Sequence, residues 1–199
     1  MEEDFRFLED LIDAIESIDD EYCSWTYYHE TIQKTERVFA YELYHQLKLI
    51  ATIKKTQYDG IKFNGEIGKK ILQDITQLGT GFTVKQKNFS PDLVLHKGQI
   101  DKQSDNQKLI IEIKTNNTTD EKITKDIIKL YYGIENLNFQ FGVFISVNTD
   151  FDILKQKLKR LFKIEQVQPN QLDNLKRIHI INFISRQLTC ETLYKIMHN

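Results

Sequence analysis

The segment LIIEIKT, residues 109 to 115, decides the fold prediction for this chain. It places one acid, Glu112, and one base, Lys114, within a short run of Leu and Ile. An apolar run of this length, rich in β-branched residues, is typical of a buried strand. Ionised groups are costly to bury unless they are paired or hold a metal ion. The segment therefore predicts a core strand in which Glu112 and Lys114 have a chemical role.

The stretch PDLVLH, residues 91 to 96, predicts the partner strand of a hairpin. A polar, turn-rich loop, residues 97 to 107, separates the two strands. With the loop midpoint near residue 102, we expect Asp92 to face Glu112 across the hairpin. Because alternate side chains share a face, two faces follow. The polar face holds Asp92, Glu112 and Lys114, and the core face holds Leu93, Leu95, Ile111 and Ile113.

Facing carboxylates on neighbouring strands lie about 5 Å apart. Two unpaired carboxylates at that distance raise each other's pKa. A hard divalent cation removes this repulsion, because Mg²⁺ prefers carboxylates, carbonyls and water as ligands. The hairpin therefore predicts a site for a hard divalent cation such as Mg²⁺ between Asp92 and Glu112.

Hydrophobic periodicity predicts alternating helices and strands along the rest of the chain. We expect helices at about residues 2–18, 30–54, 69–79, 120–135 and 150–163, and further strands at 139–148 and 176–184. The first core strand is either IKFNGEI, residues 61–67, or TVKQKNF, residues 83–89. This order predicts a central mixed β-sheet flanked by helices, with a parallel crossover among the last strands.

The length of 199 residues fits one domain. Residues 1–30 carry eleven acids and one base, although the net charge of the whole chain is only −2. The remainder is therefore basic, as a nucleic-acid partner requires. Two cysteines, distant in sequence, indicate neither a zinc site nor a disulfide framework. We expect a soluble, cytoplasmic protein without a membrane span.

The motif of Pro91-Asp92 and Glu112-Ile113-Lys114 resembles that of the PD-(D/E)XK nuclease superfamily. The resemblance implies a restriction-endonuclease-like core at about residues 30–148, with an acidic helical extension at 1–29 and a helix-strand extension at 149–199. It implies that Asp92, Glu112 and the main-chain carbonyl of Ile113 bind Mg²⁺ or Mn²⁺. It also implies that Lys114 positions the attacking water.

Many members of this superfamily add a glutamate from the first core helix. Glu36 and Glu42 are the two candidates here. At about 100° per residue, Glu36 falls on the apolar stripe that faces the sheet, which favours it over Glu42. Lys125 and Lys129, four residues apart on the following helix, are candidates for phosphate contacts.

Three functional hypotheses remain at the level of sequence. The first is a metal-dependent endonuclease that hydrolyses DNA. The second is a catalytically silent module with the nuclease fold, whose acidic N-terminal segment docks a partner or masks a basic groove. The third is an unrelated α/β domain stabilised by an ion pair. A homodimer or a protein partner is compatible with each of them.

Overall fold

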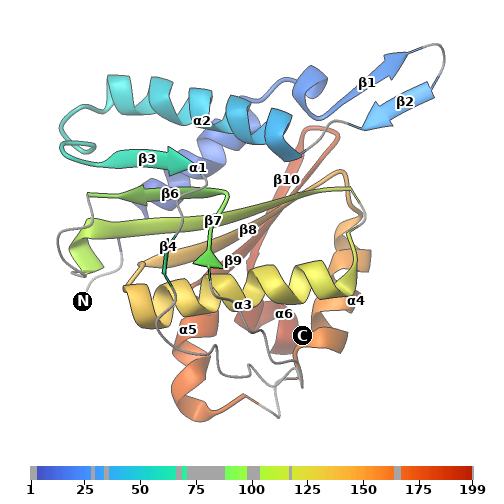
Figure 1. Cartoon of the computed structure of the whole chain (residues 1–199). Coiled ribbons are helices and arrows are strands. Elements are labelled where there is room, and N and C mark those ends of the chain that lie inside the picture. Colours follow the sequence, from blue (N-terminus) through green and yellow to red (C-terminus); the bar gives the residue numbers. More distant parts are fainter. Residues whose placement is uncertain are drawn as a thin grey trace.

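A computed structural model of the 199-residue chain describes residues 4–27, 30–33, 36–65, 69–70, 88–97, 104–116, 118–163 and 167–198. Its centre is a six-stranded mixed β-sheet with the order β10-β9-β8-β7-β6-β3 (Figure 1). The strands are β3 (Lys62–Gly65), β6 (Leu93–His96), β7 (Gln107–Thr115), β8 (Phe141–Val147), β9 (Ile178–Ile184) and β10 (Gln187–Thr192). Outside this sheet, β1 (Ser24–Tyr27) pairs with β2 (Glu30–Gln33), and β4 (Lys69–Lys70) pairs with β5 (Asn88–Phe89).

The sheet combines an antiparallel half with a parallel half. Strands β3, β6 and β7 are antiparallel neighbours, whereas β7, β8 and β9 run parallel and β10 returns antiparallel at the edge. The parallel pairs need crossover connections, which α3 (Asp120–Leu137) and α4 (Phe151–Leu161) supply. The predicted mixed sheet and parallel crossover are therefore confirmed.

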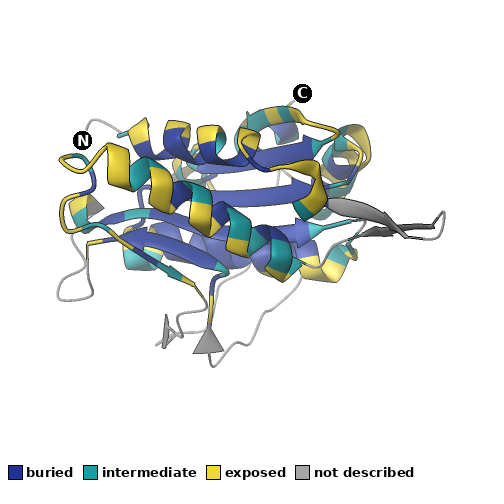
Figure 2. Ribbon diagram, turned by 90° about the horizontal axis from the view of Figure 1, so that it is seen from above, coloured by how far each residue is buried: buried dark blue, intermediate teal, exposed yellow. Residues whose placement is uncertain are grey.

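Helices cover both faces of the sheet (Figure 1). One face is covered by α1 (Arg6–Glu16) and α2 (Glu36–Ile53), and the opposite face by α3, α4, α5 (Leu172–Lys176) and α6 (Leu193–His198). Short 3₁₀ turns occur at Asp20–Tyr22, Ser104–Asn106 and Pro169–Gln171. Buried residues form the sheet and the inward faces of the helices, while the outward helix faces are exposed (Figure 2).

The β6–β7 hairpin has the predicted register. Leu93 pairs with Ile111, and Leu95 pairs with Leu109, before the register shifts between Leu95 and His96. Odd-numbered residues of β7 enter the core under α1 and α2, whereas Ile110 enters the core under α3. The side-chain alternation thus directs the even-numbered Glu112 and Lys114 towards α3.

Several element boundaries differ from the sequence-based predictions. The helix predicted at residues 30–54 begins only at Glu36, because residues 30–33 form β2. The first core strand is β3, within IKFNGEI, and it follows a turn in which Gly60 has φ of +72°. The helix predicted at 69–79 is wrong at Lys69–Lys70, which form β4, and its remaining residues lie outside the described part of the chain.

The edge strand β10 was not predicted, for two physical reasons. Its turn uses Ser185 and Arg186, both with positive φ (50° and 61°), where Gly or Asn would normally signal a hairpin. The strand itself, QLTCET, is half exposed and lacks an apolar run. The short helix α6 that follows buries Leu193 and Ile196 against the α3 face of the sheet.

Candidate functional site

Asp92 lies immediately before β6, at the point where the hairpin reaches α2. Its Oδ2 accepts a hydrogen bond of 2.7 Å from the main-chain N–H of Ile113. Burial raises the pKa of Asp92, and the Ile113 N–H and the ammonium of Lys114 only partly offset this effect. The side chain is thus held in place by the backbone of β7, next to the Glu112-Ile113-Lys114 segment.

Glu112 is completely buried between β7 and α3. Its Oε1 accepts a hydrogen bond of 2.9 Å from the ammonium of Lys129, while its Oε2 has no hydrogen-bond partner. Burial, followed by the neighbouring carboxylates of Asp126 and Asp92, raises the pKa of Glu112 well above its usual value. An orphaned carboxylate oxygen of this kind is costly in a protein interior.

The ammonium of Lys114 is surrounded by oxygen atoms. It lies 2.9 Å from the main-chain oxygen of Ile113, 3.0 Å from Glu36 Oε2 and 3.1 Å from Asp126 Oδ2. Burial alone would lower the pKa of Lys114, but the carboxylates of Asp126, Asp92 and Glu36 raise it. Lys114 is therefore a cation held between β7, α2 and α3.

Glu36 and Glu42 occupy different surroundings. Glu36, the first residue of α2, reaches Lys114 and keeps 41% of its side chain exposed. Glu42 instead accepts a hydrogen bond from Gln46 and lies near His45, both on its own helix. The structure therefore brings Glu36, and not Glu42, to the Asp92 and Glu112 pair.

The two lysines predicted to contact phosphate also differ. Lys125 is exposed on α3. Lys129 is buried, and its ammonium lies 2.9 Å from both Glu112 Oε1 and Asp126 Oδ1. The structure does not leave Lys129 at the surface beside Lys125, because α3 turns this side chain towards β7. Lys129 thus belongs to a cluster of charged side chains that also includes Glu36, Asp92, Glu112, Lys114 and Asp126.

Asp126 is a member of the cluster that the sequence analysis missed. It is buried on α3, three residues before Lys129, and it contacts the ammonium groups of both Lys114 and Lys129. The signal was available in the helix pattern, because Asp126 and Lys129 fall among the apolar positions Ile123, Ile127 and Leu130. A buried acid and base on the core face of a helix require partners from another element.

Two glycines allow α3 to lie close enough to the sheet for these contacts. A Cβ atom on Gly133 of α3 would lie 2.6 Å from Ile110 Cδ1. A Cβ atom on Gly142 of β8 would lie 3.0 Å from Leu130 Cβ. The absence of side chains at these positions permits the close approach that joins Lys129 to Glu112.

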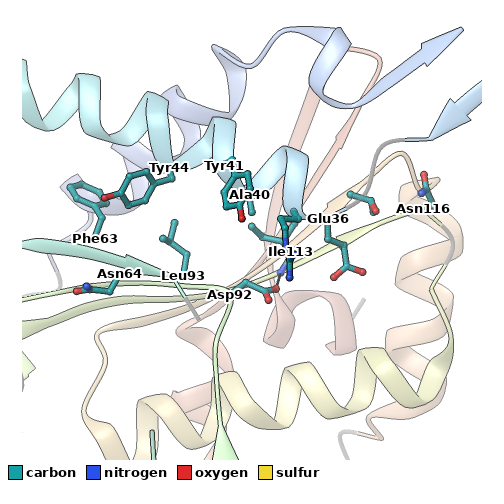
Figure 3. A pocket seen from close by; sticks show the side chains of 13 residues that line it. Glu36, Ala40, Tyr41, Tyr44, Phe63, Asn64, Asp92, Leu93, Ile113 and Asn116 are labelled. Carbon is teal, nitrogen blue, oxygen red and sulfur yellow. Dashed lines mark hydrogen bonds between the residues drawn. The ribbon is translucent and has the colours of Figure 1, made fainter. Parts of the chain in front are cut away.

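An open pocket of about 950 Å³ lies beside the cluster. Glu36, Asp92 and Ile113 form one end, and Tyr44 and Phe63 form the other (Figure 3). Its further lining residues are Arg37, Ala40, Tyr41, Asn64, Gly65, Leu93, Thr115 and Asn116. The pocket opens between α2 and the β3–β6 end of the sheet, and of the charged residues described above it is lined by Glu36 and Asp92. Glu112, Lys114, Asp126 and Lys129 are buried and are not among its lining residues.

The cluster has the charge that a divalent cation would balance. It holds the four carboxylates of Glu36, Asp92, Glu112 and Asp126 and the two ammonium groups of Lys114 and Lys129, a formal charge of −2. Within the described residues, no three His, Cys, Asp or Glu side chains are already arranged as a metal site. The lysines occupy positions between the carboxylates. The orphaned Glu112 Oε2 and the all-oxygen donor set nevertheless fit a hard cation such as Mg²⁺.

Comparisons with known proteins add no family assignment. No family model matches the chain, and neither a curated protein nor a solved structure is significantly similar to it. In the part of the chain that the structure describes, no helix is both long enough and apolar enough to cross a bilayer.

Proposed function

We propose that this protein is a metal-dependent endonuclease that hydrolyses phosphodiester bonds of DNA. The observation that carries the proposal is the meeting of Asp92, Asp126 and Glu36 around Lys114 beside an open pocket. Glu112 joins this group through Lys129, whose ammonium contacts both Glu112 and Asp126. These residues come from α2, from the β6–β7 hairpin and from α3. An ion pair that only stabilised the sheet would need neither the third carboxylate nor the access from solvent.

Each side chain has a distinct role in the proposed reaction. Asp92, Glu112, Glu36 and the main-chain carbonyl of Ile113 are the oxygen ligands available to Mg²⁺ or Mn²⁺. A divalent cation, when bound, lowers the pKa of a water molecule and neutralises charge on the phosphate. Lys114 holds its ammonium at the Ile113 carbonyl, where it orients the attacking water. Asp126 and Lys129 hold Lys114 and Glu112 in position.

The order of elements supports this assignment. The chain follows α2, β3, β6, β7, α3 and β8, with β3, β6 and β7 antiparallel. The same order of a helix, three antiparallel strands, a helix and a strand characterises the PD-(D/E)XK core that the motif resembles. In this reading, α1, β9 and β10 extend the core.

A cleavage assay tests the proposal directly. Plasmid DNA, single-stranded DNA and RNA are incubated with the protein and Mg²⁺, Mn²⁺ or EDTA, and the products are separated on gels. We expect metal-dependent cleavage of DNA that Lys114→Ala slows by about 10²- to 10⁴-fold, as for loss of a group acting on the attacking water. Lys176→Ala, which removes an exposed lysine of α5, serves as the matched control. Cleavage that Lys114→Ala leaves unchanged would contradict the assignment.

One observation favours a second function, that of a catalytically silent nuclease-fold module that binds DNA or a protein. Lys114 and Lys129 already pair with the carboxylates of Glu36, Asp126 and Glu112. In this alternative, the protein binds DNA or a partner without turnover, and Mn²⁺ produces no binding heat in titration calorimetry. Measurable Mn²⁺ binding that Asp92→Asn abolishes would contradict this alternative.

The masking role of the acidic segment has a structural obstacle. Helix α1 buries Phe7, Leu8, Leu11 and Ile15 in the core under α2. Near its end, Asp19 and Asp20 pair with Arg186 of the β9–β10 turn. Removal of residues 1–20 would therefore expose the core, so the silent module would have to use the exposed acids of α1 for docking.

A further inference from the structure

Aromatic rings line the pocket: Tyr44 and Phe63 at the end away from the carboxylates, and Tyr41 between Tyr44 and Glu36 (Figure 3). Tyr41 and Tyr44 are three residues apart on α2 and face the pocket together with Phe63 of β3 (Figure 3). Tyr44 meets Phe63 edge to face, with ring centroids 6.3 Å apart. The ring of Phe63 is itself stacked on Tyr58, with centroids 5.4 Å apart. Tyr44 is therefore held against the buried ring of Phe63.

Tyr41 is 68% exposed and Tyr44 is 37% exposed, although aromatic side chains on a helix usually bury much of their area. Most of Tyr41 is thus accessible from solvent at the mouth of the pocket. An exposed aromatic surface inside a concave site is a common feature of ligand recognition. The exposed aromatic surface of Tyr41 and Tyr44 fits a planar, apolar ligand.

Polar and cationic groups flank these rings. Asn64 is also a lining residue, but its side chain lies on the other face of β3 from Phe63, where its Oδ1 forms a hydrogen bond with His96 Nε2. The ammonium of Lys48 lies 5.6 Å from the centroid of the Phe63 ring. Arg37, the residue after Glu36 on α2, also lines the pocket. A ligand in the pocket therefore meets aromatic rings and the basic residue Arg37.

We infer that this pocket takes an unstacked nucleobase of a single DNA strand, adjacent to the phosphate that is cleaved. The inference rests on the proposed function and assigns it a substrate class, namely unpaired DNA. Aromatic rings stack on any base, whereas the bases of an intact duplex are enclosed between their neighbours and cannot reach Tyr41. The carboxylate end of the pocket holds the scissile phosphate, and the aromatic end holds the base beside it.

The test measures DNA binding without cleavage. Fluorescence anisotropy is recorded with Ca²⁺ for a single-stranded oligonucleotide, for a hairpin duplex of the same sequence and for 2′-deoxyadenosine monophosphate. We expect tighter binding of the single strand, and quenching of a 2-aminopurine base within it by stacking. Tyr41→Ala weakens single-strand binding by roughly 5- to 150-fold.

Two further variants make the result specific. Tyr41→Phe keeps the ring face and retains binding to within about 2-fold, because stacking does not need the hydroxyl group. Leu49→Ala, which truncates another exposed residue of α2 outside the pocket, leaves binding unchanged. Circular dichroism spectra identify any variant that fails to fold. Tyr44→Phe and Tyr44→Ala repeat the same comparison at the second ring.

The outcomes separate this inference from the proposed function. Any of three results would contradict the base pocket. The first is equal affinity for duplex and single strand, and the second is binding of the mononucleotide as tight as that of the strand. The third is unchanged binding in both Tyr41→Ala and Tyr44→Ala. Metal-dependent cleavage observed alongside those results would leave the nuclease function intact. Conversely, loss of single-strand binding in Tyr41→Ala, without cleavage by any metal, supports the base pocket and removes the nuclease function.

Discussion

The ammonium of Lys129 on α3 lies 2.9 Å from Glu112 Oε1 on β7, and both side chains are buried. This contact joins the helix to the centre of the sheet at the candidate site. The carboxylate of Asp126 lies equally close to the same ammonium. Because buried charges depend on their partners, the stability of the protein should be sensitive to either residue.

Replacing Lys129 by Met should destabilise the protein by about 3–5 kcal/mol at neutral pH, because it leaves buried carboxylates without their cation. Urea denaturation followed by circular dichroism measures the change. The double variant Lys129→Met/Glu112→Leu should recover most of this loss, since both charges are then removed. A double variant no more stable than Lys129→Met would contradict the ion-pair explanation.

Binding of Mn²⁺ should stabilise the folded protein. At a concentration of 100 times its Kd, the ion contributes about 2.7 kcal/mol, or roughly 5–10 °C in Tm for a chain of this size. Asp92→Asn should remove the shift, whereas Asp173→Asn, an exposed acid of α5, should keep it. Differential scanning fluorimetry with EDTA as the reference makes the comparison. A shift that persists in Asp92→Asn would place the metal elsewhere.

Among the acidic residues of α1, Asp10 should contribute most to the free energy of unfolding. It is buried, and its carboxylate accepts hydrogen bonds from Lys54, from Gln57 at 2.7 Å and from the Tyr58 hydroxyl at 2.8 Å. Asp10→Ala should cost about 2–4 kcal/mol because it leaves the buried Tyr58 hydroxyl unpaired. Asp13→Ala, an exposed acid of the same helix, is the control and should stay within about 0.5 kcal/mol of the wild type. Urea denaturation of both variants measures the free energy of unfolding, and an equal loss in Asp10→Ala and Asp13→Ala would contradict the prediction.

His179 should make the stability depend on pH. Burial lowers the pKa of His179 to about 4, from 6.5 for an exposed histidine. Below pH 6.5, therefore, His179 is protonated in the unfolded chain. In the folded chain it stays neutral until the pH falls to about 4. Stability is thus fully present above pH 6.5 and declines as pH falls towards 4, by about 3 kcal/mol in total from this residue.

The comparison of wild type with His179→Gln isolates this effect. The variant cannot titrate at this position, so its free energy of unfolding should fall less steeply between pH 6.5 and 4. Parallel curves for the two proteins over this range would show that His179 is protonated equally in both states. Urea denaturation at a series of pH values provides the measurement.

Gly133→Ala should destabilise the α3 contact with β7 by about 1–2 kcal/mol. The new methyl group would lie 2.6 Å from Ile110 Cδ1, and the cost of overpacking exceeds the gain in helix propensity. Ile110→Val removes the clashing atom, so the double variant should be more stable than the two single changes predict. Lys122→Ala, on the exposed side of α3, provides the control. Additive effects in the double-mutant cycle would show that α3 does not contact Ile110 in this way.

The hairpin was the most predictable part of the site. The spacing of Pro91-Asp92 and Glu112-Ile113-Lys114 around one polar loop fixed which residues pair, and Leu93 indeed pairs with Ile111. Alternation along a strand then assigned Ile111 and Ile113 to one face, as observed. The helical stripe of α2 similarly favoured Glu36 over Glu42, and Glu36 is the glutamate that reaches Lys114.

The part of the site that α3 contributes was less predictable. Asp126 was missed, and Lys129 was predicted to contact phosphate and not a carboxylate, because their partners Glu112 and Lys114 come from another element. Residues 185–186 gave no hairpin signal, since neither is Gly or Asn. The helix predicted at 30–54 also began too early, because pairing with β1 holds residues 30–33 in a strand.

The sequence by itself determined the local features of this protein: the periodicity of α1, α2 and α3, the alternation along β7 and the register of its hairpin. These depend on interactions between residues close in sequence or joined by one short loop. Only the tertiary structure decided that α3 lies against β7, with Lys129 buried beside Glu112, and that Tyr41 and Tyr44 face a pocket next to Asp92. The reason is that helix packing depends on the fit of distant surfaces, here on two glycines that leave room for close approach.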